Sequence, residues 1–232
     1  LVTSTTYGQS CIKYKRSAYR HWIDADSDCQ STRNEVLIEE SVVPVRFKTG
    51  SGCKVLSGKW VDPYTGRTFT SPKKLDVDHV VPLKEAHDSG SWKWSREKKK
   101  QFANYLKHEN HLVAVYASAN RKKGAKDPAK WLPSNQSFLK DYARIWIKIK
   151  VDWGLSADRA ELRALKQILE GEAVIYPMEA PEFICAGNPF SAPSSVARPD
   201  AGEVVKKSKS GICHDTSSRS YNRTKRFTAF DS

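Results

Sequence analysis

The sequence lacks the features that mark membrane-spanning, zinc-binding and disordered proteins. No stretch reaches the ~18 to 20 consecutive apolar residues that cross a bilayer, so we expect no membrane segment. None of the 5 cysteines belongs to a Cys-x-x-Cys pair, which argues against a thiolate zinc site. Internal repeats are missing too, which excludes a solenoid. Hydrophobic residues make up 39% of the chain, enough to bury a core and to exclude a disordered composition.

Methionine is almost absent, and this bears on cellular location. The chain starts at Leu1, and its only methionine is Met178. We therefore expect that a secretory signal was removed and that the protein is extracellular. Five cysteines fit an oxidising compartment. Because five is odd, one cysteine has no partner in the chain, and we expect it to be Cys213, with its partner beyond Ser232.

Positive charge is what the sequence has in excess. The formal net charge is +13 over 232 residues. A basic surface attracts polyanions and speeds their capture, so nucleic acid is the first candidate partner, ahead of anionic membranes and cell-wall polymers. Many soluble proteins are basic as well, so charge alone does not decide the function.

Composition divides the chain into four parts. Residues 1–10 are polar and predicted to be loose, and residues 11–190 form the main domain. Residues 191–210 are rich in Ser, Pro, Ala and Lys and are predicted to be a linker. Residues 211–232 are interpreted as an incomplete small module or a tail.

Two strands and a short helix are predicted at the centre of the main domain. The alternating run LDVDHVVPL, residues 75–83, predicts a strand, and LVAVY, residues 112–116, predicts another. Residues 117–123 are expected to be helical and to end at Gly124. Further elements are two short strands over 60–69, helices over 95–107 and 137–151, a helix capped by Ser156, and either a helix or a strand over 34–45.

Residues suited to phosphodiester cleavage lie on these central elements. Asp78 and His79 fall in the first strand, His111 precedes the second, and Asn120 follows His111 by nine residues. A histidine can accept a proton from the attacking water near neutral pH. Asp78 and Asn120 offer the oxygen ligands that Mg²⁺ prefers, whereas Asn is a poor zinc ligand.

The runs DVDHVVPLKEAHDSGSW, HLVAVYASANRKKG and KDPAKWLP resemble the secreted bacterial branch of the HNH nucleases, in the His-Me finger or ββα-metal superfamily. WIDADSDCQSTRNEVL and SGKW fit the same branch, and the resemblance covers roughly residues 14–154. It implies an α+β fold with a ββα-metal core, long insertions, supporting helices and disulfides. It also implies a metal-dependent endonuclease that leaves 5′-phosphate ends.

The resemblance assigns roles by position. His79 matches the general base, whose other ring nitrogen a backbone carbonyl orients, and Asp78 and Asn120 match the ligands of one Mg²⁺, with Mn²⁺ or another divalent cation as an alternative. His111 occupies the catalytic-loop bracing position, which is usually Asn. That departure leaves its role open, and Asn110 is an alternative bracing residue.

Other residues receive secondary roles. Arg121, Lys122, Lys123 and Arg33 are candidates for nucleic-acid binding, and the first three could equally be a solvated face. Glu85 and Glu35 are candidate outer groups around the metal; Glu85 could instead be a solvated helix-start acid, and Glu35 could form a buried ion pair with Arg33. The resemblance further implies a Cys29–Cys53 disulfide, and Cys11–Cys185 is the remaining plausible bridge.

Three acids upstream look like the start of a calcium loop. Asp24, Asp26 and Asp28 alternate along the chain, but we expect the glycine and the distal glutamate usual in such a loop to be missing at the right offsets. We interpret them as turn formers.

The function predicted is hydrolysis of DNA, with RNA as an open alternative, by a monomer that reads little sequence. A non-catalytic basic DNA-binding protein is the first alternative, since its charge would suffice for binding. The second is a structural metal or envelope-binding module, in which Asp78 and His79 serve stability alone. No protein partner is predicted.

Overall fold

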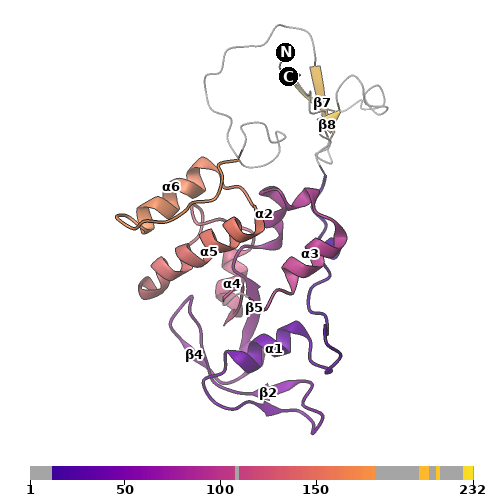
Figure 1. The fold of residues 1–232 in the computed structure, drawn as a ribbon, viewed down its shortest axis with the longest axis vertical. Helices are drawn as coiled ribbons and strands as arrows, with labels where there is room; N and C mark the ends of the chain where they lie inside the picture. The colour runs from indigo at the N-terminus through magenta and orange to yellow at the C-terminus, as the bar shows by residue number, and fades with distance from the viewer. Residues whose placement is uncertain (1–11, 108–109, 181–203, 209–212, 215–226, 232) are drawn as a thin grey trace. The chain divides into compact units, whose positions relative to one another are not determined.

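The computed structural model describes residues 12–107, 110–180, 204–208, 213–214 and 227–231 (Figure 1). The chain divides into two compact units, Lys15–Ala180 and a second that joins Leu1–Tyr14 to Pro181–Ser232. In the second unit β7 (Val204–Ser208) pairs antiparallel with β8 (Cys213–His214) and β9 (Phe227–Asp231). β7 lies inside the segment predicted as a linker. That prediction rested on the overall composition of the segment and overlooked two consecutive valines, Val204 and Val205.

A two-stranded antiparallel ribbon followed by a helix forms the centre of the larger unit. β5 (Leu75–His79) pairs with β6 (Leu112–Tyr116), with His79 opposite Leu112 and Leu75 opposite Tyr116. α4 (Ala117–Lys123) follows β6 directly and contacts both strands. Gly124 ends α4 with a φ of 57°, as the sequence predicts. The β-β-α order expected from the sequence is therefore present.

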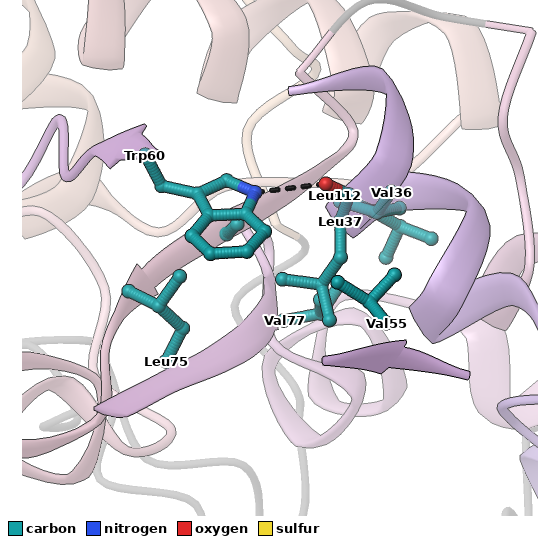
Figure 2. Packing of buried hydrophobic residues seen from close by; sticks show 8 residues of the cluster. Val36, Leu37, Val55, Trp60, Leu75, Val77 and Leu112 are labelled. Carbon is teal, nitrogen blue, oxygen red and sulfur yellow. Dashed lines mark hydrogen bonds between the residues drawn. The ribbon is translucent and has the colours of Figure 1, made fainter. Parts of the chain in front are cut away.

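One face of this ribbon is the floor of a hydrophobic core (Figure 2). Leu75, Val77, Leu112 and Ala114 pack against α1 (Thr32–Glu39), β2 (Val55–Ser57) and Trp60. The Trp60 indole Nε1 donates to the carbonyl oxygen of Leu37 at 2.8 Å, so its polar atom is satisfied inside the core (Figure 2). Each large side chain buried here contributes about 1.5–3 kcal/mol.

Two small hairpins border the ribbon. β1 (Arg46–Phe47) pairs with β2, and β3 (Trp60–Val61) pairs with β4 (Thr68–Phe69), as predicted for residues 60–69. Cys29 and Cys53 form a disulfide, which confirms that pairing. Cys11 and Cys185 lie outside the described residues.

Four further α-helices and four 3-10 helices complete the described residues of this unit. Ser95 caps the N-terminus of its helix, as predicted, by accepting from the Lys98 backbone N–H. The prediction that Ser156 caps a helix was wrong. Asp158 caps α6 by accepting from the Glu161 N–H, while Ser156 bonds to Ser89. The elements are α2 (Leu83–Asp88), α3 (Arg96–Ala103), α5 (Leu139–Trp153), α6 (Arg159–Ile168), η1 (Arg16–Tyr19), η2 (Pro72–Lys74), η3 (Ser91–Lys93) and η4 (Gln136–Phe138).

Within this unit, β5 and α4 lie between α1 with the β1–β2 hairpin on one side and α2, α5 and α6 on the other (Figure 1). The central elements are thus held from both sides. Across the described part of the chain, no helix has the length and apolarity needed to span a membrane.

Candidate active site

Asp78 and His79 end β5, and the strand carries them to opposite faces. Successive side chains of a strand alternate, so His79 shares a face with Val77, whereas Asp78 shares one with Asp76. Their contacts agree, because Asp78 meets α4 and His79 meets Trp22 and the end of α3. Both stand at the same end of the ribbon, but their side chains contact different neighbours.

Asp78 is held by a lysine and a tyrosine. Its Oδ2 accepts from Lys123 Nζ at 2.6 Å and from the Tyr64 hydroxyl at 2.7 Å. Lys123 is fully buried and also donates to the His79 carbonyl oxygen at 2.9 Å. Burial raises the pKa of Asp78 although Lys123 and Tyr64 oppose that change, and burial lowers the pKa of Lys123 against the pull of Asp78.

Asn120 contacts the other acid of that face. Its Nδ2 donates to Asp76 Oδ2 at 3.2 Å, so within the described residues it bonds to Asp76 rather than to Asp78. Asn120 and Lys123 lie one turn apart on α4, and Asp76 and Asp78 lie two positions apart on β5. Because α4 runs along β5, the two pairs are set side by side.

His79 is oriented by a backbone carbonyl, as its predicted role requires. Its Nε2 lies 2.9 Å from the Ala103 carbonyl oxygen. A carbonyl only accepts, so Nε2 carries the proton, and Nδ1 is the basic nitrogen of the neutral ring. The ring stacks on Trp22 at 5.2 Å and is 4% exposed. Burial holds the pKa of His79 well below 6.5, with His111, Arg16 and His21 adding to the decrease, so the ring is neutral at pH 7.

His111 braces the same helix end that orients His79. Its Nε2 bonds the Phe102 carbonyl oxygen at 2.8 Å, one residue before the carbonyl that holds His79. Both carbonyls lie in the last turn of α3, where backbone acceptors have no partner within the helix. Asn110 has a φ of 64°, a left-handed conformation that asparagine tolerates well.

The predicted outer acids lie in other clusters. Glu85 accepts from Lys150 Nζ at 2.8 Å and from Ser89 Oγ at 2.7 Å, so it is neither a solvated acid nor a contact of Asp78. Glu35 forms no ion pair with Arg33 in the described structure, because the Arg33 Nη2 donates to the carbonyl oxygens of Pro72 and Leu75. The expected pair is therefore absent there.

The basic residues after Asn120 divide into two kinds. Arg121 and Lys122 are exposed and can meet a phosphate. Lys123, predicted with them, is instead buried against Asp78, which corrects its assignment to nucleic-acid binding. Helical periodicity explains the difference, since every third or fourth residue of α4 faces the ribbon.

The polar face of the ribbon has the right donors for a hard divalent cation. Within the described residues, both side-chain hydrogen bonds of Asp78 go to Oδ2, and Asn120 bonds through its amide nitrogen. Asp78 Oδ1, the Asn120 carbonyl oxygen and the half-buried Asp76 remain as acceptors. Oxygen donors of this kind fit Mg²⁺, which binds through one or two protein carboxylates and keeps several waters.

Asp76, Tyr64 and Trp22 were missed as site residues in the sequence, and the contact of Lys123 with Asp78 was missed because Lys123 was predicted to bind nucleic acid. Asp76 could have been found, because strand alternation places it beside Asp78. Lys123 could have been found from the helical spacing to Asn120. Tyr64, in the β3–β4 turn, and Trp22, far upstream, give no local signal of their contacts with Asp78 and His79.

Comparison with known proteins adds a family. The family model described as GmrSD restriction endonucleases, C-terminal domain, matches residues 31–168. An uncharacterized secreted protein of the fungus Arthroderma benhamiae is 37% identical over 156 residues, which cover 67% of this chain and 74% of that protein. No solved structure matches the chain.

Proposed function

Because the chain belongs to the family of GmrSD restriction endonuclease C-terminal domains, we propose that it is a metal-dependent nuclease of the HNH, ββα-metal kind. The observation that carries this proposal is the state of His79. Its Nε2 is fixed on the Ala103 carbonyl oxygen, and its depressed pKa keeps Nδ1 unprotonated at neutral pH. A neutral imidazole at the end of the strand that carries Asp78 is a general base ready to act.

The residues of the chain divide the work in the proposed reaction. His79 Nδ1 takes the proton of the water that attacks phosphorus. Asp78 and Asn120 hold the divalent cation, with Asp76 beside them, and Lys123 and Tyr64 fix the Asp78 carboxylate. When bound, that cation supplies positive charge against the developing phosphate charge. His111 keeps the end of α3, and hence the ring of His79, in place.

The side chains of Asp78 and His79 project to opposite faces of β5, and this arrangement determines how a substrate would bind. Both residues end β5, so a phosphodiester laid across that strand end meets the imidazole on one side and the acids on the other. Arg121 and Lys122, exposed on α4, would contact flanking phosphates. Such contacts read the backbone rather than the bases, so little sequence preference is expected. The proposed substrate is DNA, with RNA to be tested, and the proposed products carry 5′-phosphates.

An extracellular location is part of this proposal. The fungal relative is described as a secreted protein, and a disulfide joins Cys29 to Cys53. Disulfides persist in oxidising compartments. A secreted nuclease would meet nucleic acid outside the cell.

The test is digestion of plasmid DNA and RNA with and without EDTA, by wild type, His79→Gln and Asp78→Asn. Glutamine can still donate to Ala103 but has no basic nitrogen, so His79→Gln should keep its melting temperature while cleavage falls by about 10²–10⁴. Asp78→Asn should need a higher Mg²⁺ concentration than wild type for half-maximal cleavage. Cleavage by His79→Gln near the wild-type rate would refute the assignment of the base.

A non-catalytic DNA-binding protein is the alternative that this experiment separates. It predicts that DNA binding persists in EDTA and that neither DNA nor RNA is cut at any Mg²⁺ concentration. The basic charge of the chain favours binding under either function, so only the cleavage result decides between them.

A further inference from the structure

Three aspartates gather in the loop between Trp22 and α1. Ligand oxygens of Asp24, Asp26 and Asp28 lie within 4.8 Å of one another, and all three residues are exposed. Within the described structure none of them pairs with a lysine or arginine. Three carboxylates so close repel one another, but exposed acids alone would not define a site.

A buried carboxylate oxygen next to this loop lacks a partner. Glu35 Oε2, on the first turn of α1, is buried and has no hydrogen-bond partner within the described structure. Burial raises the pKa of Glu35, and Asp26, Asp28 and Asp24 add to the rise, so the carboxyl group faces the field of all three. A buried acceptor without a partner destabilises the fold, and more so if it is charged. A cation is the partner that would satisfy it.

The spacing of these four acids is that of a calcium loop. Counted from Asp24 as position 1, Asp26 and Asp28 are positions 3 and 5, and Glu35 is position 12. Side chains at these positions bind Ca²⁺ in a 12-residue EF-hand loop, together with a backbone carbonyl at position 7, here Gln30.

Position 6, where glycine is usual, does not break the pattern. Cys29 stands there with a φ of 73°, the left-handed conformation for which glycine is normally chosen. The missing glycine is therefore no obstacle to a calcium loop. The expectation that the distal glutamate is missing was wrong, because Glu35 stands at position 12.

We propose that Asp24, Asp26, Asp28, the Gln30 carbonyl and Glu35 bind one Ca²⁺ ion. Four carboxylates and a carbonyl can supply the six to eight oxygens that Ca²⁺ takes, whereas Mg²⁺ demands a tighter octahedron and keeps its waters. Glu35 lies outside the group within 4.8 Å, so binding would draw its carboxylate toward the three aspartates. This site shares no residue with Asp78 and Asn120, and it stands whether or not the chain is a nuclease.

Bound Ca²⁺ would stabilise two parts of the molecule that adjoin this loop. The loop is joined through Cys29 and Cys53 to the β1–β2 region, and α1 packs under the central ribbon. Trp22, two residues before Asp24, stacks on His79. Ca²⁺ would thus hold the segment that covers the His79 ring.

The test is calcium titration of the chelator-stripped, disulfide-intact chain by calorimetry, with terbium luminescence as a second reading. Trp22 lies close enough in sequence to sensitise Tb³⁺ in this loop. We expect one Ca²⁺ per chain with a Kd on the order of 10⁻⁴ to 10⁻³ M, as in extracellular calcium modules. Ca²⁺ should displace Tb³⁺ and raise the melting temperature, while Mg²⁺ should do so at least tenfold less effectively.

Variants assign the ion to the loop. Asp26→Asn and Glu35→Gln should each weaken Ca²⁺ binding at least tenfold, and both should fold, because an amide keeps the shape and Glu35 gives up no hydrogen bond. Glu39→Gln, one turn along α1 and exposed, should bind like wild type, as should Asp78→Asn. Absence of Ca²⁺ binding, equal preference for Mg²⁺, or binding unchanged in Asp26→Asn and Glu35→Gln would overturn the proposal.

Discussion

Two buried lysines invite comparison, because they have the same chemistry and opposite surroundings. Lys123 and Lys150 are both fully buried. Lys150 meets Glu85, Glu161, the Ser89 hydroxyl and the Ser156 carbonyl, all within 2.9 Å. Lys123 meets one carboxylate, that of Asp78, and the carbonyl oxygen of His79.

The difference lies in which acceptors remain. Around Lys150 both oxygens of Glu161 accept hydrogen bonds, Oε1 from Trp146 Nε1 and Oε2 from Lys150, and Glu85 Oε1 accepts from Lys150 and Ser89. This closed cluster of Lys150, Glu85 and Glu161 joins α2, α5 and α6, and its three charged residues are all buried. Beside Lys123, Asp76 and Asn120 are half-buried and keep free oxygens. Burial of charge alone therefore does not identify a functional site, whereas free oxygen acceptors beside a buried ion pair point to one.

The largest effect should come from breaking the closed cluster. Lys150→Met leaves two buried carboxylates without their cation, and the free energy of unfolding should fall by about 3–5 kcal/mol. Urea unfolding followed by circular dichroism measures this. Lys148→Met, whose partner Asp152 is exposed on the same helix, is the control and should cost less than about 1 kcal/mol. Equal losses in the two variants would contradict the comparison.

Lys123→Met should lower the free energy of unfolding less than Lys150→Met does, but it should change the Mg²⁺ dependence of cleavage. Asp78 keeps the Tyr64 hydroxyl and a little exposure, so we expect a loss of about 1–3 kcal/mol. Because the carboxylate is no longer held, the Mg²⁺ concentration for half-maximal cleavage should shift. Lys123→Arg retains the charge in a larger group and serves as the comparison. A drop in stability with an unmoved Mg²⁺ dependence would make Lys123 purely structural.

The raised pKa of Glu161 in the closed cluster should make the stability of the fold depend on pH. Burial raises the pKa of Glu161 to about 7, although Lys150 opposes it. The folded chain then binds this proton more tightly than the unfolded one, whose pKa lies near 4.5. The contribution is complete below pH 4.5 and is lost as pH rises through 7. Glu161→Gln should flatten the pH dependence of stability in that window by about 3 kcal/mol, measured by urea unfolding at each pH.

The smallest effect concerns the exposed end of α4. Replacing Arg121 and Lys122 by alanine removes two phosphate contacts, so the slope of log Kd against log salt should decrease by up to about 2. Binding of a short duplex followed by fluorescence anisotropy reports the slope. Exposed Lys166 and Arg163 on α6 provide a double-alanine control. A slope unaffected by the α4 changes would place the nucleic acid elsewhere.

Periodicity and spacing predicted the local elements well but not their contacts. β6 and α4 have the predicted bounds, because a valine-rich run and a terminal glycine are local signals. The Cys29–Cys53 bridge followed from the resemblance and is present. Lys123 was misplaced because a basic run was treated as one surface, although a helix turns one residue in three or four inward.

Long-range contacts could not be deduced. Tyr64 and Trp22 reach the site from segments whose own patterns describe only a turn and a core aromatic. Glu85 lies near Asp78 in sequence, yet α5 and α6 draw it into the Lys150 cluster. Which partner a buried charge finds depends on how distant helices pack, and no local spacing encodes that.

The two adjacent carbonyls at the end of α3 have a consequence for the energy of the reaction. A helix carries partial negative charge at its C-terminus, and the rings of His79 and His111 are fastened to that pole. In the proposed reaction, the imidazole of His79 would become a cation at the pole of α3 as it takes the proton of the attacking water. The helix would then lower the energy of that short-lived charged ring, while burial keeps the ring uncharged until the proton arrives.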